Sequence, residues 1–304
     1  MSETQKILFI GLSCVGDAVM TTPVLRALHE AYPDAGIDIV ADSKSSDIFE
    51  YCAYRGKVIY KDKKRFLRGA PALLSELRKT NYELIVDLRT DGLTMLMRGK
   101  KKLTKRKGES YGPHAIEGFM GVIKSVHGDN DIPATTIWIT QQQRLAAEET
   151  LRSLGAARVL AMAPGCGGKN PKKFWQLNKY AQLANNLSDN FDGVLLLGSK
   201  QDSVLTREIA KQVKLPLLDL AGKTDLLEAA ALLEKATVFV GSDSGLGHVA
   251  GAMGTSTLSF FSVDKPARCL PWGPFAQYLE GEEEDARNIT VQAAEKMVRE
   301  AIGR

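Results

Sequence analysis

The stretch "VGSDSGLGHVAGAMG" at residues 240–254 completes the β-like run "TVFV" and predicts a buried strand that turns directly into a helix. The apolar residues of this helix stand at positions i, i+3, i+4 and i+7, the spacing of one buried helix face: Leu246, Val249, Ala250 and Met253. Asp243 or Ser244 is the expected N-cap, because both side chains can accept a bond from the first helical amides. A strand, a tight turn and a helix in this order are half of a β-α-β unit.

The same alternation extends along the chain in both directions. The other short apolar runs are "KILFIG" (6–11), "GIDIVA" (36–41), "ELIVDL" (83–88), "RVLAMAPG" (158–165), "GVLLLGS" (193–199) and "LPLLDLAG" (215–222). Helical patterns lie between most of them, which is typical of parallel sheets covered by helices. We therefore predict an α/β fold.

The alternation is interrupted once, in the polar segment 129–140, and restarts after the polar helix predicted at 141–155. This interruption predicts two domains, residues 1–140 and 141–285, followed by a terminal segment 286–304 that contains an amphipathic helix. A chain of 304 residues is long enough for two hydrophobic cores.

Composition excludes several classes of protein. Hydrophobic residues make up 44% and charged residues 25% of the chain, which is too apolar for disorder. The longest uncharged stretch, 244–263, is rich in glycine and serine, so no membrane span is predicted. The first apolar run leads into Asp17 and lacks the cleavage pattern of a secretory signal. Four cysteines without a C-x-x-C pair indicate a reducing compartment rather than a disulfide scaffold or structural zinc.

The turn at 243–248 is the first of three loops that carry candidate chemistry. A helix start offers unpaired amides and a partial positive charge, and Gly245 and Gly247 would let a ligand approach those amides. This pattern favours an anion site, such as a phosphate. A capped turn with His248 facing the core is the alternative.

The second loop follows the first strand, where Gly11 and Gly16 have P-loop spacing but precede Asp17 instead of lysine. The segment also lacks the G-x-G-x-x-G pattern of dinucleotide binding. A carboxylate at such a turn suits a general base that takes a proton from a hydroxyl nucleophile. Its alternative role is to provide negative charge at a helix N-terminus.

The third loop, "APGCGGKNPKKFW" (163–175), places glycines after a strand and lysines behind them, a pattern that could hold a diphosphate or form a plain basic turn. In "GSKQD", Asp202 could accept bonds from ribose hydroxyls or cap the next helix. The D-x-D pattern at 129–131 lies in the polar linker, where convergent oxygens for a metal are not expected. We predict neither a metal nor a cofactor.

Positive charge is concentrated in the first half. Residues 51–110 hold 17 lysines and arginines against six acidic residues, although the net charge of the whole chain is only +4. Such a region attracts anionic partners, including phosphate-rich lipid and nucleic acid. A solvated basic face is an equally good explanation. Nucleic acid is disfavoured, because residues 98–108 contain no aromatic side chains for base stacking.

Assembled in order, four segments resemble the ADP-heptose:lipopolysaccharide heptosyltransferase family, glycosyltransferase family 9. They are "IGLSCVGDAVMTTPVLRALHEAYPDAGIDIV", "APG…KKFW", "LDLAGKTDLLEAAALLEKATVFVGSDSGLGHVAGAMGTSTLSFF" and "PWGP". The G-D-x-x-x-T-T-P and D-S-G-x-x-H elements are specific in combination. The resemblance covers nearly the whole chain.

This resemblance implies a GT-B fold, in which two Rossmann-like domains with parallel sheets face each other across a cleft. It implies that the first domain binds the acceptor, that the second binds the sugar nucleotide, and that the terminal helix packs back on the first domain. Asp17 resembles the catalytic base. The implied donor-binding residues are Lys173, Asp202, Asp243, Ser244, Gly245, Leu246, Gly247 and His248. The expected acceptor-binding residues are Gly16, Lys64, Arg65, Arg89, Lys101 and His114.

Two departures from the family pattern concern the donor contacts. The family often has glutamate where Asp202 stands, and proline after the tryptophan matched by Trp175, where this chain has Gln176. Lys172 could take the place of Lys173 because the glycine and lysine stretch before it is irregular.

The activity implied is transfer of heptose from ADP-heptose to a hydroxyl of a lipopolysaccharide inner-core acceptor, with inversion and without a metal. The expected partners are the ADP-sugar, an anionic lipid-linked saccharide and the membrane surface, with no nucleic acid. The expected location is the cytoplasm, at the inner face of the inner membrane. A different nucleotide sugar or acceptor, or an inactive nucleotide-binding GT-B domain, remains the alternative.

Overall fold

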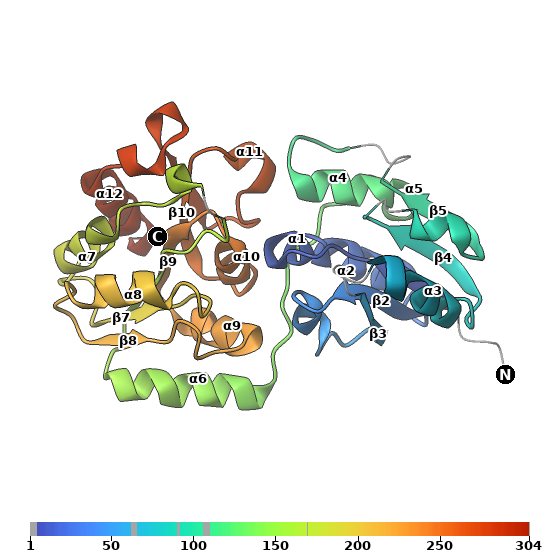
Figure 1. Cartoon of the computed structure of the whole chain (residues 1–304), viewed down its shortest axis with the longest axis horizontal. Coiled ribbons are helices and arrows are strands. Elements are labelled where there is room, and N and C mark those ends of the chain that lie inside the picture. Colours follow the sequence, from blue (N-terminus) through green and yellow to red (C-terminus); the bar gives the residue numbers. More distant parts are fainter. Residues whose placement is uncertain (1–4, 62–65, 90–91, 106–109, 169, 304) are drawn as a thin grey trace. The chain divides into compact units, whose positions relative to one another are not determined.

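The computed structural model describes residues 5–61, 66–89, 92–105, 110–168 and 170–303. It divides into two compact units between Trp138 and Ile139, two residues before the predicted boundary. Each unit contains one wholly parallel sheet with helices packed on it (Figure 1). Among the described residues, no helix combines the length and the apolar character needed to cross a membrane.

The first unit is built on a five-stranded sheet of order β3-β2-β1-β4-β5. Its described elements are β1 (Lys6–Ile10), α1 (Val15–Met20), α2 (Thr22–Ala31), β2 (Gly36–Asp42), η1 (Ser46–Phe49), β3 (Arg55–Lys61), α3 (Phe66–Leu77), β4 (Tyr82–Asp87), η3 (Leu93–Leu96), β5 (Gly99–Thr104), α4 (Ala115–Val122) and α5 (Lys124–His127). The apolar runs predicted as strands form β1, β2 and β4 at the centre of the sheet, where both faces are buried.

The two edge strands come from the basic stretches that the sequence pattern did not identify as strands. In β5, "GKKKLT", no residue is fully buried, and the chain pairs only with β4. Lysines on an edge strand keep the open edge from pairing with another sheet. Part of the positive charge between residues 51 and 110 therefore has a structural explanation.

The second unit is built on a six-stranded sheet of order β11-β10-β9-β6-β7-β8. Its described elements are α6 (Gln141–Leu154), β6 (Val159–Ala163), η4 (Pro171–Lys173), α7 (Leu177–Asn186), β7 (Gly193–Leu196), α8 (Ser203–Ala210), β8 (Leu217–Asp219), α9 (Leu226–Lys235), β9 (Val238–Ser242), α10 (Gly245–Ala252), β10 (Ser256–Phe261), α11 (Pro266–Cys269), β11 (Ala276–Glu280), η5 (Glu282–Glu284), η6 (Ala286–Asn288) and α12 (Val291–Ile302). Its core is centred on Trp175, Tyr180 and Phe260, whose rings are in mutual contact.

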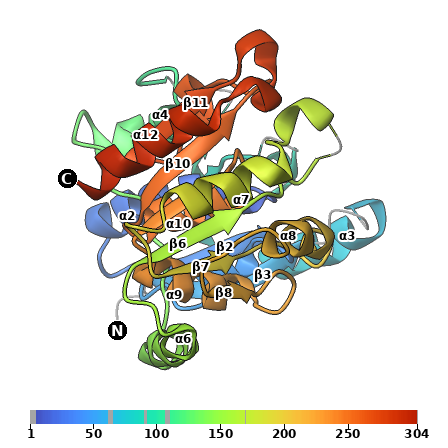
Figure 2. The same cartoon turned by 90° about the vertical axis from the view of Figure 1, so that its left-hand side faces the viewer.

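The terminal helix belongs to the second unit, so the prediction that it packs back on the first domain is wrong. Val291, Ala294 and Val298 form the buried face of α12 and join the core of the second sheet. Arg299 donates to the backbone carbonyl of Asn186 and pairs with Asp189 at the end of α7. Figure 2 shows α12 and α7 across one face of this sheet. The amphipathic pattern predicted a buried face without specifying the surface that buries it.

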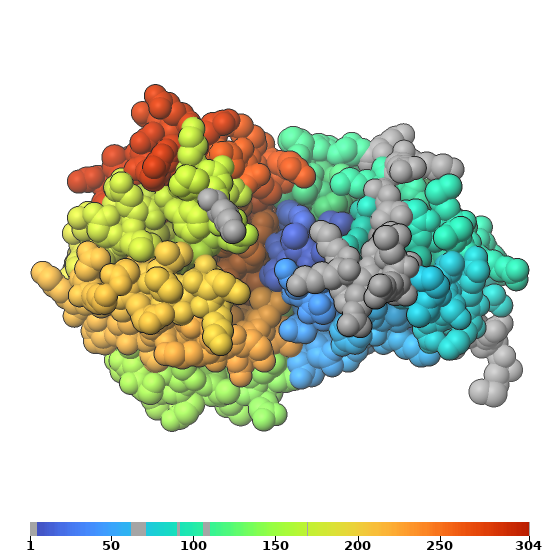
Figure 3. Space-filling model, in the orientation of Figure 1, coloured from blue at the N-terminus to red at the C-terminus, as the bar shows by residue number. Residues whose placement is uncertain are grey.

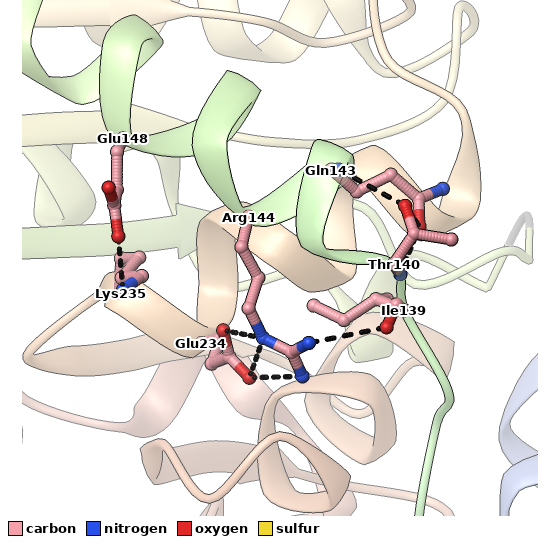
Figure 4. A network of polar contacts seen from close by, with 7 residues as sticks. All are labelled: Ile139, Thr140, Gln143, Arg144, Glu148, Glu234 and Lys235. Carbon is pink, nitrogen blue, oxygen red and sulfur yellow. Dashed lines mark hydrogen bonds and ion pairs between the residues drawn. The ribbon is translucent and has the colours of Figure 1, made fainter.

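Polar contacts attach α6 to α9, directly after the boundary between the units (Figure 4). The Arg144 guanidinium donates to the Glu234 carboxylate through two of its nitrogens, with Nε 2.9 Å from Oε2 and Nη2 3.0 Å from Oε1. Thr140 caps α6 through a reciprocal bond pattern with Gln143. In the space-filling view α6, in green, lies directly against the orange segments of the same unit (Figure 3).

Candidate functional site

The turn after β9 lies in the middle of the second sheet, because β9 pairs with both β6 and β10. Ligands of parallel α/β sheets bind beyond the carboxyl ends of such central strands. The Asp243 amide donates to the Phe260 carbonyl, and α10 begins two residues later at Gly245. Ser244 is the N-cap by backbone position, but its side chain makes no capping bond. Its buried hydroxyl has no hydrogen-bond partner among the described residues.

The two glycines of this turn have different roles. The Gly247 amide donates to the Ser244 carbonyl at 3.2 Å, and a Cβ at Gly247 would lie 3.3 Å from the Ser259 hydroxyl. Gly247 therefore allows close packing of α10 on β10, and its own amide already has a partner within the turn. Gly245 and Leu246 supply the first two amides of the helix, which lack intrahelical partners. These amides, with the Ser244 hydroxyl, are the donors that an anion would meet.

His248 lies one turn further along α10 and is buried, with 6% of its surface exposed. Val249 and Ala250 are fully buried, whereas Leu246 and Met253 are only partly buried. The predicted apolar face is thus confirmed in its centre.

Lys173 is held between two carboxylates at this turn. Its Nζ lies 3.6 Å from Oδ2 of Asp243 and forms a closer ion pair with Asp264. The Lys173 side chain is 20% exposed, Asp243 16% and Asp264 39%. Lys173 comes from η4 after β6, Asp243 follows β9 and Asp264 follows β10, so three neighbouring strands of the sheet deliver this cluster. We call Lys173, Asp243 and Asp264 the lysine cluster.

Burial and charge shift the pKa values within the lysine cluster. Burial raises the pKa of Asp243 to about 6, with Lys173 opposing the shift and Asp264 adding to it. The hydrogen bond from Lys173 lowers the pKa of Asp264. Burial alone would lower the pKa of Lys173, but Asp264 and Asp243 outweigh it and the pKa is raised. Lys173 is therefore a permanent cation at neutral pH, and Asp243 is the group closest to titration.

Asp264 was missed in the sequence, although it resembles Asp243 in following directly after a buried strand. The position of a carboxylate beyond a strand's carboxyl end was the available signal. The thiols of Cys166 and Cys269 are also near this cluster. Burial raises the pKa of Cys166, and that of Cys269 to about 12, so neither is a nucleophile at neutral pH.

The structure separates the two candidate lysines. Lys172 Nζ donates to the Glu283 carbonyl at 3.2 Å, away from the lysine cluster, whereas Lys173 contacts Asp243. Asn170 caps the turn that carries both lysines by accepting a bond from the Lys172 amide. Lys173, not Lys172, is the cation near the start of α10.

Asp202 closes the turn after β7. Its Oδ2 accepts bonds from the Ser199 amide at 2.8 Å and from the Ser199 hydroxyl at 2.6 Å. Its carboxylate also lies against Gly165 after β6, where an added Cβ would approach Oδ1 to 2.3 Å. Gly165 therefore leaves space for the Asp202 carboxylate, which packs against the loop between β6 and η4. The contact of Asp202 with ribose hydroxyls stays a prediction.

In the first unit, Asp17 lies in the first turn of α1, after the carboxyl end of the central strand β1, and is partly buried. Gly16 beside it is buried. The threonines that follow build the break between α1 and α2: the Thr21 and Thr22 hydroxyls donate to the carbonyls of Ala18 and Val19, at 2.7 and 2.8 Å. This break ends α1 one turn after Asp17. The carboxylate is therefore presented on a short, well-packed element.

The predicted acceptor residues that the structure describes come from different elements of the first unit. Lys101 is exposed on the edge strand β5, and Arg89 is partly buried just after β4. His114 is buried and caps α4, with Nδ1 accepting from the Ile116 amide at 3.2 Å, so it has a structural role. Lys64 and Arg65 lie outside the described residues. The residues that the structure describes contain no group of three potential metal ligands, and Asp129 and Asp131 are exposed in the linker.

Comparison with known proteins gives consistent matches. Residues 90–298 match the family model of glycosyltransferase family 9 (heptosyltransferase). Lipopolysaccharide heptosyltransferase 3 of Escherichia coli is 25% identical over 289 residues, covering 84% of this chain and 82% of the relative. Lipooligosaccharide heptosyltransferase 2 of Haemophilus influenzae is 26% identical over 314 residues, covering 91% and 90%.

Two solved structures share the fold. The glycosyltransferase family 9 structure from Veillonella parvula superposes with a TM-score of 0.85 at 21% identity, covering 99% of this chain and 98% of that one. The E. coli ADP-heptose lps heptosyltransferase II has a TM-score of 0.81 at 21% identity and covers 98% of both chains. A third similar structure, E. coli heptosyltransferase WaaC, was solved with ADP and has a TM-score of 0.79 at 18% identity, covering 98% of this chain and all of that one.

Proposed function

Because the chain belongs to glycosyltransferase family 9 and has its GT-B fold, we propose that it transfers heptose from ADP-heptose to a hydroxyl of a lipopolysaccharide inner-core acceptor. The relatives named above are called a lipopolysaccharide heptosyltransferase and a lipooligosaccharide heptosyltransferase, which supports heptose transfer. Asp17 acts as the general base, the acceptor oxygen attacks the anomeric carbon, and ADP leaves from the opposite side. The sugar is therefore transferred with inversion.

The observation that carries the donor half of the proposal is Lys173 beside the start of α10. A diphosphate at this turn would accept hydrogen bonds from the amides of Gly245 and Leu246. Its oxygens would also replace Asp264 as the ion-pair partner of Lys173. The start of a helix contributes roughly 0.3 to 1 kcal/mol to anion binding when exposed, and about 2 when partly buried. Negative charge builds on the diphosphate as the sugar leaves, so these groups stabilise the transition state more than the bound donor.

The net charge of the lysine cluster explains why Asp243 matters for binding. With both aspartates ionised, the cluster carries one net negative charge, which opposes a diphosphate. Asp243 is buried and is already the more weakly acidic of the two carboxyls. We infer that donor binding is accompanied by proton uptake at Asp243. This step removes the net negative charge from the cluster.

The acceptor half rests on Asp17 and on the positive charge of the first unit. A carboxylate at the end of β1 needs no metal to take a proton from a hydroxyl, and general bases of this kind contribute about 10² to 10⁴ in rate. The basic surface of the first unit would attract the phosphates and acidic sugars of a lipid-linked acceptor. We place the enzyme in the cytoplasm, at the inner face of the inner membrane.

A nucleotide-sugar panel tests this proposal. Thermal unfolding is measured with ADP-, UDP-, GDP- and dTDP-sugars, since a ligand that binds only the folded state raises its stability. We expect ADP-heptose to raise the melting temperature more than the other diphosphate sugars at equal concentration. A larger shift with UDP-, GDP- or dTDP-sugar would reject ADP-heptose as the donor. No shift with any of them would reject a nucleotide-sugar site.

A further inference from the structure

The short turn η3 in the first unit presents two adjacent apolar side chains to solvent. Met95 is 78% exposed and Leu96 is 58% exposed, whereas Leu93 and Thr94 in the same turn are buried. Scattered single apolar residues are normal on protein surfaces, but two exposed neighbours on one turn are a candidate contact site. The turn therefore directs half of its side chains into the core and the other half outward.

Polar contacts fix this turn in place from both sides. The Arg78 guanidinium donates to the Leu96 carbonyl, with Nε at 3.1 Å and Nη2 at 2.6 Å. Lys102 Nζ donates to the Met97 carbonyl at 2.6 Å, and the Thr94 hydroxyl donates to the buried Asp87 carboxylate. The outward direction of the two apolar side chains is thus set by the fold.

Positive charge surrounds the apolar pair. Arg98 comes two residues after Leu96, and Lys100, Lys101 and Lys105 are exposed along and just beyond the edge strand β5. One lysine is partly neutralised, because Lys100 Nζ lies 2.6 Å from the Glu83 carboxylate. Protection of a sheet edge accounts for lysines on β5. It does not account for two exposed aliphatic side chains beside them.

We propose that this surface, which we call the β5 surface (Met95, Leu96, Arg98, Lys100, Lys101 and Lys105), docks on an anionic phospholipid bilayer. Met95 and Leu96 enter the acyl boundary and the cations contact lipid phosphates, the combination that peripheral membrane anchors use. Methionine and leucine offer no ring on which bases stack, so the pair favours lipid over nucleic acid. The proposal deepens the proposed function, on which the choice of a membrane partner rests.

The docking fits the position of the catalytic residue within the first unit. β5 lies two strands from β1 in the sheet, and neighbouring strands are about 4.8 Å apart, so the edge is roughly 10 Å from the strand that leads to Asp17. Parallel strands end on the same side, so Lys105 after β5 and Asp17 after β1 lie at the same end of the sheet, whereas Arg98 and Lys100 lie at the end where β4 and β5 begin. A bilayer along β5 would therefore run along the flank of the unit, from the end where Arg98 lies to the end where Asp17 lies.

Vesicle binding of a paired set of variants tests the apolar contact. Met95→Ser/Leu96→Ser is compared with Leu145→Ser/Val204→Ser, which removes two apolar side chains of similar exposure, 56% and 59%, from the second unit. Vesicles of phosphatidylglycerol in phosphatidylcholine are sedimented with the full chain at about 0.1 M salt. We expect the first variant to lose about tenfold or more in apparent affinity. The second should remain within about twofold of the parent.

The ionic contact has its own readout in the same assay. Lys100→Gln/Lys101→Gln should lose about fivefold for each cation that contacts lipid. Binding of the parent should weaken steeply as salt rises towards about 1 M. Equal binding to pure phosphatidylcholine, or unchanged binding of Met95→Ser/Leu96→Ser, would overturn the proposal. Tighter binding to a single-stranded RNA homopolymer than to vesicles would overturn it in favour of nucleic acid.

Insertion itself is measured with Leu96→Trp and vesicles whose acyl chains are brominated. We expect the fluorescence of the tryptophan in Leu96→Trp to be quenched. The control Leu145→Trp should show no more quenching than the parent. Fluorescence of Leu96→Trp that is quenched no more than that of the parent would contradict insertion. The serine variants should keep the thermal shift with ADP-heptose. If the parent binds vesicles through Met95 and Leu96 yet transfers no heptose, the β5 surface stands and the proposed function fails. If heptose transfer occurs without vesicle binding, the proposed function stands and the proposal for the β5 surface fails.

Discussion

Replacing Lys173 with methionine is expected to weaken binding of the ADP-sugar donor by about 10- to 150-fold. Methionine preserves much of the side chain's length and apolar stem and removes only the charge. Two unit charges about 4 Å apart attract by about 4 kcal/mol at an effective dielectric constant of 20. The diphosphate must compete with Asp264 for this ammonium, so only part of that energy remains. A charge-assisted hydrogen bond contributes about 1.5 to 3 kcal/mol net, which gives the stated range.

The same substitution leaves Asp243 and Asp264 facing each other without a cation. The pKa of Asp243, already raised by burial, should rise further, since Lys173 is the group that opposes the shift. We expect the variant to remain folded. Its free energy of unfolding should fall by only about 1 to 2 kcal/mol, because Asp243 and Asp264 are partly exposed. Thermal unfolding without ligand separates this cost from the loss of donor affinity.

Lys172→Met is the matched control for this prediction. It removes an equal charge one residue away, but Lys172 Nζ contacts the Glu283 carbonyl and not the lysine cluster. Isothermal titration with ADP-heptose should give a dissociation constant within about twofold of the parent for this variant. The reasoning would be refuted if Lys173→Met bound the donor like the parent, or if both substitutions weakened binding equally.

Three further substitutions have expected outcomes. Asp17→Asn should lower single-turnover transfer by about 10² to 10⁴ while ADP-heptose binding stays within about twofold, and unchanged transfer would remove Asp17 from the role of base. Asp243 titrates near a pKa of about 6 and a bound diphosphate favours its protonated form, so affinity for ADP-heptose should rise severalfold as pH falls from about 7.5 to 5.5. Asp243→Asn should abolish that rise, and affinity that falls on acidification would contradict the linkage. Arg144→Ala should destabilise the second unit by about 1 kcal/mol in urea unfolding. The control Arg152→Ala should cost at most about 0.5 kcal/mol, because both side chains of its ion pair are 72% exposed. Equal effects would show that burial of the Arg144–Glu234 pair is irrelevant.

The central strands were predictable and the edge strands were not, for a physical reason. β1, β6 and β9 are buried on both faces, so their residues form continuous apolar runs that stand out in a sequence. β3 and β5 gain their order from backbone bonds to one neighbour, while most of their side chains are partly or fully exposed. Lysines satisfy that environment, so the basic runs were interpreted as charge patterns without secondary structure.

The candidate site was predictable residue by residue but not as a cluster. Asp243 and Lys173 could be singled out because each follows a strand that ends at the same edge of a parallel sheet. The direction of neighbouring side chains in η4 depends on the backbone of one short turn, which the sequence does not specify. The sequence therefore left Lys172 as an alternative to Lys173 until the structure showed the partners of both. Asp264 contacts Lys173 across a separation of 91 residues, and no local pattern reports such a pair.

The assay that tests the central claim most directly is heptose transfer itself, followed by mass spectrometry and by the anomeric signals in an NMR spectrum. The purified chain is incubated with ADP-heptose and a truncated inner-core acceptor in detergent. The proposed function predicts an acceptor heavier by one heptose, release of ADP in equal amount, and an anomeric configuration opposite to that of the donor. Retained configuration would contradict direct displacement with Asp17 as base, and ADP release without any heavier acceptor would contradict the transfer.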